Sequence, residues 1–245
     1  MTYKLNKQTA YEDYEKYIRR ISQLCLDFLQ DITIPQYQKE FSWQEIEAMS
    51  PNEVISRLLF GFNLAQIKGR YGSDIAPDLF ENLPGINLEE VLKEVFEGAY
   101  QYAAGGDDID SNAKDAFRRL TYVYTKLSAA QGGSIHVQKR GRMVEDTVLE
   151  QVSPRYAYAV SLFFARSNFT TSMQFARIAP DPSTVCTTPR VLFTLAGVTN
   201  GYIMQLIREE KLPAEKKHGV WNIQVLPAFE WLQQRKDCPN WIGQL

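Results

Sequence analysis

The sequence predicts a mainly α-helical protein, in which a helical N-terminal domain precedes a small C-terminal module of short helices and one β-type run. Three observations support this fold class. Apolar residues recur at three- and four-residue intervals through residues 1–178, which is the spacing of one helix face. Two prolines in residues 179–183 indicate a linker. Beyond the linker, two short helical patterns precede a run of β-forming residues.

Helical patterns follow one another through residues 1–178. Several begin with a hydroxyl or amide side chain that caps free backbone amides, and Ser50-Pro51-Asn52-Glu53 is the clearest of these starts. Gly105-Gly106 and Gly132-Gly133 separate neighbouring patterns, and residues 134–137 form either a short strand or a loop. The predicted helices cover about 8–30, 51–66, 88–103, 111–130, 154–164 and 170–178.

The predicted domain boundary lies at residues 179–186, because the segment Ala-Pro-Asp-Pro-Ser favours an extended linker. The C-terminal module covers residues 187–245. Its first helix begins at Thr188-Pro189, where the hydroxyl caps free amides and the proline needs no donor. Gly197 ends this helix, since glycine takes the positive φ of a tight turn at little cost. Thr199 then caps the next helix.

The second helix of the module is expected to expose polar residues. Apolar residues at helical spacing mark its buried face: Ile203, Leu206 and Ile207. A polar loop over residues 215–219 follows, with two cations and a glycine turn. A β-type run at 220–223 comes next, and the last helix opens at Pro227.

Taken in order, these pieces form a pattern. Its motifs are Ala196-Gly197-Val198-Thr199, Leu206-Ile207-Arg208-Glu209-Glu210-Lys211-Leu212-Pro213-Ala214, Trp221-Asn222-Ile223 and Trp231-Leu232. The set covers about 50 of the 245 residues and resembles the excisionase/MerR-like winged helix-turn-helix family. The resemblance implies a winged helix-turn-helix that binds DNA, in a transcription regulator or an excision-type factor of a mobile element. Two departures are Asn200-Gly201-Tyr202 early in the recognition helix and Glu210 at its end, where glycine is usual.

The expected DNA-binding residues form two groups. Directed towards the groove are Thr199, Asn200, Tyr202 and Gln205. Placed on backbone phosphates are Arg190, Arg208, Lys216 and Lys217, with His218 in the same wing loop as a phosphate contact or a solvated side chain. Residues 187–236 carry seven Lys/Arg and four Glu, a net charge of +3 in a chain of −2. This asymmetry favours nucleic-acid contact through the module.

Composition and motifs argue against several other classes of protein. No run approaches the length of a membrane span, and the N-terminus lacks the apolar core of a secretion signal. The three cysteines, Cys25, Cys186 and Cys238, are scattered, so we expect a cytoplasmic protein. No Cys/His/carboxylate cluster has metal-ligand spacing, and no dinucleotide or nucleophile motif occurs. We therefore expect no metal, no cofactor and no enzymatic activity.

The leading hypothesis is sequence-directed binding of double-stranded DNA. One such module buries too little DNA for tight binding, so the helical domain is expected to form a homo-oligomer. The alternative is an adaptor or scaffold whose C-terminal module docks a partner protein. Two further runs have open interpretations. The basic run is Lys139-Arg140-Gly141-Arg142, which is either a second phosphate-contacting loop or a solvated turn, and we favour the solvated turn. The acidic run is Asp107-Asp108-Ile109-Asp110, which is either a calcium-type loop or a solvated segment that leads into a helix, and we favour the latter.

Overall fold

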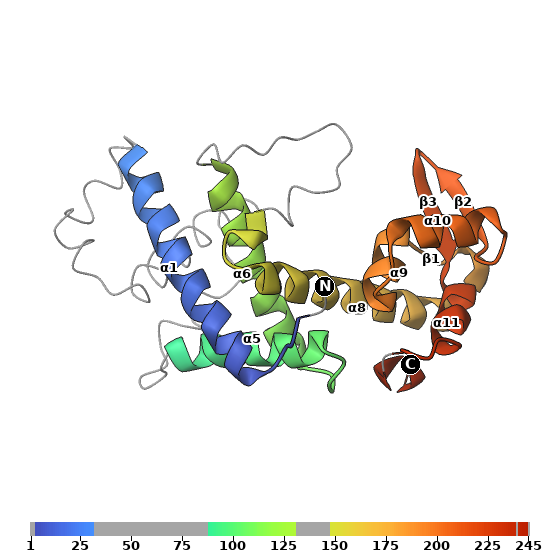
Figure 1. The fold of residues 1–245 in the computed structure, drawn as a ribbon, viewed down its shortest axis with the longest axis horizontal. Helices are drawn as coiled ribbons and strands as arrows, with labels where there is room; N and C mark the ends of the chain where they lie inside the picture. The colour runs from blue at the N-terminus through green and yellow to red at the C-terminus, as the bar shows by residue number, and fades with distance from the viewer. Residues whose placement is uncertain (1–2, 32–87, 131–147, 239, 245) are drawn as a thin grey trace. The chain divides into compact units, whose positions relative to one another are not determined.

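The structure is a computed structural model that describes residues 3–31, 88–130, 148–238 and 240–244. In these residues the chain is mainly helical, with one small three-stranded sheet near the C-terminus (Figure 1), which confirms the mainly α fold class. The helix expected after Ser50, the strand or loop at 134–137 and the basic run at 139–142 lie outside the described residues.

The described residues form two compact units. Unit 1 takes its residues from 1–6, 99–109 and 158–245, and unit 2 takes its residues from 7–98 and 110–157. The boundary expected at 179–186 is therefore not where the chain divides, because that segment lies inside unit 1.

Unit 2 is built around buried aromatic rings. Helix α1 (Lys7–Asp31), helix α6 (Ser111–Ala130) and parts of α5 (Leu88–Ala103) and α8 (Pro154–Ile178) contribute to it. The ring of Tyr17 lies 5.3 Å from Phe96, 5.6 Å from Tyr124 and 5.8 Å from Tyr156, measured between centroids. The Tyr17 hydroxyl donates to the Leu120 carbonyl at 2.7 Å, so its polar end is satisfied inside the core. The predicted bounds of α5 and α6 are confirmed, and those of α1 are confirmed to within one residue at each end.

A buried carboxylate anchors the start of α8. Ser153 caps this helix, because its Oγ accepts a hydrogen bond from the Tyr156 amide at 2.8 Å. The same hydroxyl donates to Oδ1 of Asp13 at 2.9 Å, and the Arg155 guanidinium donates to both oxygens of Asp13. The Asp13 side chain is fully buried, and this network satisfies both of its oxygens.

Helix α8 is one continuous helix, and the expectation of two helices over 154–164 and 170–178 is wrong. The residues between them, Ala-Arg-Ser-Asn-Phe, include no proline or glycine that would end a helix. Ala165 and Phe169 are also buried in the core of unit 1, so packing holds the helix together across this stretch.

The segment expected to be a linker is folded within unit 1. Asp181 caps a single 3₁₀ turn, η2 (Pro182–Thr184), by accepting from the Ser183 amide. Strand β1 (Cys186–Thr187) follows and pairs antiparallel with β3 (Val220–Gln224). Backbone pairing and the cap therefore replace the extended linker that the two prolines predict.

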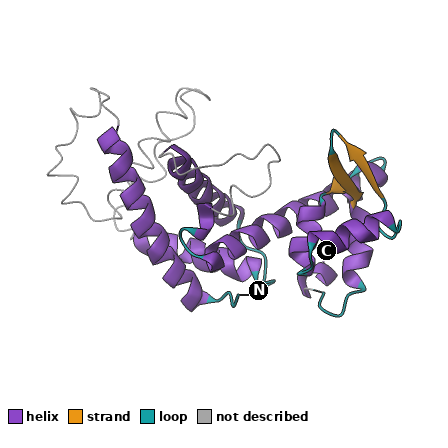
Figure 2. Cartoon of the chain, turned by 45° about the horizontal axis from the view of Figure 1, so that its top comes forward, coloured by secondary structure: helices purple, strands orange, loops and turns teal. Residues whose placement is uncertain are grey.

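The sheet has the order β1-β3-β2 and contains one tight hairpin, drawn in orange in Figure 2. Strand β2 (Ala214–Lys217) pairs antiparallel with β3, and Lys217 lies opposite Val220. Only His218 and Gly219 form the turn, with φ of 50° and 81°. Two residues with positive φ are the usual two-residue hairpin connection. The expected loop over 215–219 is thus wrong, because most of it pairs as a strand.

The last α-helix, α11 (Val225–Gln233), begins at Val225. The sequence predicted a start two residues later, at Pro227. Proline is tolerated there because the amides of the first helical turn have no intrahelical acceptor. The Val225 amide donates instead to the Val185 carbonyl at 3.0 Å, which fixes the start of α11 beside β1.

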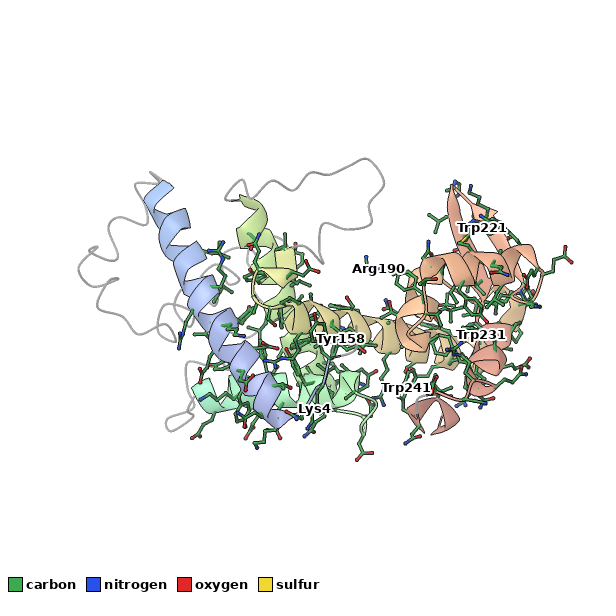
Figure 3. The ribbon with its side chains drawn as sticks, viewed as in Figure 1. Lys4, Tyr158, Arg190, Trp221, Trp231 and Trp241 are labelled. Atoms are coloured by element: carbon green, nitrogen blue, oxygen red, sulfur yellow. The ribbon has the colours of Figure 1, made fainter. Side chains whose placement is uncertain are left out.

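A buried arginine closes the core of unit 1 near the C-terminus. The Arg166 guanidinium lies over the rings of Tyr102, at 4.0 Å, and Trp241, at 4.7 Å. It donates to the carbonyls of Tyr102 and Gly106, and burial lowers the pKa of Arg166 below its usual value. Trp241, labelled in Figure 3, lies in the 3₁₀ helix η3 (Asn240–Gln244). The arginine therefore joins α8 to the end of α5, to the turn that follows it and to η3 by cation–π contacts and hydrogen bonds.

Replacing Asp13 with alanine should lower the free energy of unfolding by about 3 kcal/mol, because Arg155 loses a buried partner and Ser153 loses an acceptor. Urea unfolding followed by circular dichroism measures the change. Glu12→Ala is the matched control, since Glu12 also pairs with Arg155 but is exposed, and it should change stability little. Equal losses for the two variants would contradict the role given to Asp13.

Candidate nucleic-acid interface

The turn between the two short helices of the module has the predicted geometry. Helix α9 (Pro189–Ala196) begins with Pro189 at its first position, and the Thr188 hydroxyl accepts from the Val191 amide at 3.4 Å. Gly197 ends the helix with φ of 63° and ψ of 26°, in the left-handed region. The capping roles of Thr188 and Gly197 are confirmed.

Helix α10 (Asn200–Arg208) follows the turn and presents one polar face to solvent. The Thr199 hydroxyl accepts from the Tyr202 amide at 3.2 Å, so it caps the helix as predicted. The buried face consists of Ile203, Leu206 and Ile207. The exposed face carries most of the residues expected to reach the groove or the phosphates: Asn200, Tyr202, Gln205 and Arg208.

A carboxylate binds two of the polar groups at the end of α10. Gln205 donates from Nε2 to Glu209 at 2.7 Å, and the ammonium of Lys211 lies 2.8 Å from the same carboxylate. Hydrogen bonds from these two side chains hold the pKa of Glu209 below its usual range, and Lys211 has the larger effect. The contact to Glu209 uses one N–H of the Gln205 amide, and the amide has a second N–H and an acceptor oxygen.

Helix α10 ends in a Schellman motif. The Glu210 amide donates to the Ile207 carbonyl at 3.1 Å, and the Lys211 amide donates to the Leu206 carbonyl at 2.9 Å. Glu210 occupies the left-handed position of the motif, with φ of 57°. Glycine is favoured at such a position because it has no Cβ, so Glu210 holds a backbone conformation that glycine adopts with less strain.

The hairpin places its cations at the end farthest from β1. Lys216 and Lys217 are exposed on β2, and His218 is exposed in the turn. Lys217 forms an ion pair with Glu215, which raises the pKa of Lys217 above its usual value. Lys216 lies opposite Trp221, on the other face of the hairpin. The two lysines therefore point to opposite sides of the hairpin.

The structure groups most, but not all, of the expected site residues. Those on the exposed face of α10 share one surface, and Lys216, Lys217 and His218 share the hairpin end. Arg190 is separate, since it projects from α9 on the side away from Trp221 of the hairpin (Figure 3). Glu209 and Glu215 were not foreseen as part of the surface. Glu209 lies four residues after Gln205 on a helix, and Glu215 lies two residues before Lys217 on a strand. Residues at these spacings share one face of their element, so the sequence contains the signal for both pairs.

The acidic run before α6 is a helix lead-in, as favoured from the sequence. Asp110 accepts hydrogen bonds from the amides of Asn112, at 2.8 Å, and Ala113, at 3.2 Å. Among the described residues no group of three or more His, Cys, Asp or Glu side chains is placed to hold a metal ion. No helix within the described ranges is long and apolar enough to cross a membrane.

Comparisons of this chain with protein-family models, with curated proteins and with solved structures found no match. The case for a function therefore rests on the residues of the chain and their geometry.

Replacing Glu210 with glycine should raise the free energy of unfolding of unit 1 by about 1 kcal/mol, because the strained left-handed backbone no longer carries a Cβ. Thermal unfolding is the measurement. Glu209→Gly is the control: the φ of Glu209 is −83°, and the variant loses the contacts to Gln205 and Lys211, so it should destabilise. Stabilisation by both variants, or by neither, would refute the argument from the backbone.

Proposed function

We propose that this protein binds double-stranded DNA through a winged helix-turn-helix, with α10 as the recognition helix and the β2–β3 hairpin as the wing. The observation that carries the proposal is the succession of α9, the Gly197 turn, α10 and the hairpin around one apolar core. A single helix with a polar outer face fits the major groove of B-DNA, and a cationic hairpin beside it suits the phosphate backbone.

The roles of the residues follow from their positions on α10 and the hairpin. Asn200 and Tyr202 stand in the first turn of α10, where a recognition helix meets base edges. Thr199 acts mainly through its cap, which holds that turn in place. Gln205 keeps its bond to Glu209 through one N–H and offers its second N–H and its oxygen to a base. The phosphate contacts are assigned to Arg190, Arg208, Lys216, Lys217 and His218.

Modest affinity for one module is part of the proposal. Glu209 and Glu215 each neutralise a lysine at the surface, so binding to DNA must break or share these ion pairs. We propose that the protein acts as a homo-oligomer that brings two or more modules to neighbouring sites, as a regulator or an excision-type nucleoprotein of a mobile element.

The second candidate function is an adaptor whose unit 1 docks a protein partner. Two exposed apolar side chains favour it, because Tyr202 is 41% exposed on α10 and Val220 is 46% exposed beside the wing turn. Aromatic side chains of this kind are enriched at protein interfaces. The two functions differ in one observable, since only duplex binding depends steeply on salt concentration.

Replacing Lys216 and Lys217 together with alanine should weaken binding to every duplex about equally. The slope of log K against log salt should also fall by roughly two, about 0.9 for each lost phosphate contact. Fluorescence anisotropy with labelled duplexes at several salt concentrations measures both effects. The control is Lys4→Ala with Lys114→Ala, which removes the same charge outside the module.

Two outcomes would count against this assignment. A changed base preference with an unchanged slope would remove the lysines from the phosphate contacts. Absence of duplex binding by the parent protein at low salt would end the DNA-binding proposal and favour the adaptor.

Replacing Asn200 with alanine should relax the preference at one base pair by about 1–3 kcal/mol, because the amide pairs with an adenine edge. Selection from a randomised duplex library, before and after the substitution, measures the change. Arg208→Ala is the contrasting variant, and it should weaken all duplexes without altering preference. If the two variants behave in the opposite way, α10 lies along the backbone and sequence is read elsewhere.

A further inference from the structure

Gly201 lies in the middle of the exposed face of α10. Residues about one turn apart share a face of a helix, and Gly201, Gln205 and Arg208 stand at positions i, i+4 and i+7. All three are exposed, whereas Ile203 and Ile207 lie on the opposite side of the helix and are buried. The stripe of α10 that points directly away from the core therefore begins with a residue that has no side chain.

Nothing in the described part of the chain requires glycine at this position. The φ of Gly201 is not positive, whereas Gly105, Gly197 and Gly219 have φ of 94°, 63° and 81°. Among the described residues, a Cβ at position 201 would meet only Oγ1 of Thr199, at 3.8 Å, which is an ordinary van der Waals contact. Neither the backbone conformation nor crowding within the chain therefore accounts for this glycine.

Glycine also weakens the first turn of α10. It forms helix less well than any residue except proline, because it loses the most backbone freedom on folding. The helix has only nine residues, and the amides of Tyr202 and Ile203 hold its first turn through hydrogen bonds of 3.2 and 3.3 Å to Thr199. Alanine would strengthen this turn without a clash. Glycine in such a place is typical of a backbone that a ligand approaches closely.

We propose that Gly201 is the point at which α10 comes closest to DNA, and that its missing side chain lets the first helical turn enter the major groove. This inference rests on the proposed function. Gln205 lies one turn further along the same stripe, so it reaches the base edges with the free groups of its amide. Asn200 and Tyr202 flank the glycine, each about 100° round the helix, and enter the groove with it.

Substitutions at Gly201 should affect stability and DNA binding in different directions. Alanine and leucine both form helix better than glycine, and the position has room for a Cβ. In the full-length chain, Gly201→Ala and Gly201→Leu should therefore unfold at or above the midpoint temperature of the parent protein. Thermal unfolding followed by circular dichroism measures this. A lower midpoint for the alanine variant would show that the chain itself needs glycine, and would overturn the proposal.

DNA binding is measured by fluorescence anisotropy with two duplexes of equal length. One is selected by the parent protein from a randomised library, and the other is an unselected sequence. Gly201→Ala should weaken binding to the selected duplex several-fold, and Gly201→Leu by roughly tenfold or more, because each added carbon lies at the closest contact. Binding to the unselected duplex depends on phosphate contacts and should change little.

Gly243→Ala is the matched control. Gly243 lies in η3, and a Cβ there meets none of the described residues within 4 Å, so the same change is made away from α10. This variant should bind both duplexes as the parent does. Equal losses for the alanine variants at positions 201 and 243, or a loss of the same size on both duplexes, would overturn the proposal.

Two further outcomes separate this inference from the proposed function. If the parent protein binds and selects a duplex, but both Gly201 variants bind it as tightly, the close approach is wrong and DNA binding stands. If the parent protein binds no duplex at low salt, both proposals end.

Discussion

The arrangement of unit 1 depends on a single apolar core in which the second part of α8 packs with the helices of the C-terminal module. Phe169 of α8 is fully buried there, together with Leu192 of α9, Ile203 of α10 and Leu232 of α11. Each such side chain contributes about 1.5–3 kcal/mol by leaving water. Because α10 must turn Ile203 inwards, its polar face is left to solvent, and the candidate interface is a consequence of core packing.

On the candidate interface, charged side chains form pairs of opposite sign. Glu209 binds both Gln205 and Lys211, and Glu215 binds Lys217, so the net positive charge of the module is spread among ion pairs. Exposed pairs of this kind are screened by salt and exchange readily. Glu209, Glu210 and Glu215 also give the end of α10 and the start of β2 an acidic side. Exposed cations and carboxylates therefore alternate within a few residues of each other on this surface.

Local signals predicted the local structure well. The caps at Thr188 and Thr199 and the left-handed Gly197 depend on backbone groups within a few residues, and all three are confirmed. The wrong predictions concern segments whose structure depends on contacts with residues distant in the chain. The 179–186 segment is ordered by pairing of Cys186 with Gln224, and β2 extends through Lys217 because β3 lies beside it. Helix α8 continues past Phe164 because Phe169 is buried.

By itself, the sequence determined the mainly helical class, the starts of α9 and α10 and the turn between them, because capping and glycine conformation act within one turn of backbone. The tertiary structure alone decided that 158–178 belongs with the module and that Arg190 stands apart from Trp221 of the hairpin. It also decided that Glu210, Glu215 and Cys186 line one cavity. These groupings arise from packing between segments that are distant in the chain, which residue spacing does not record.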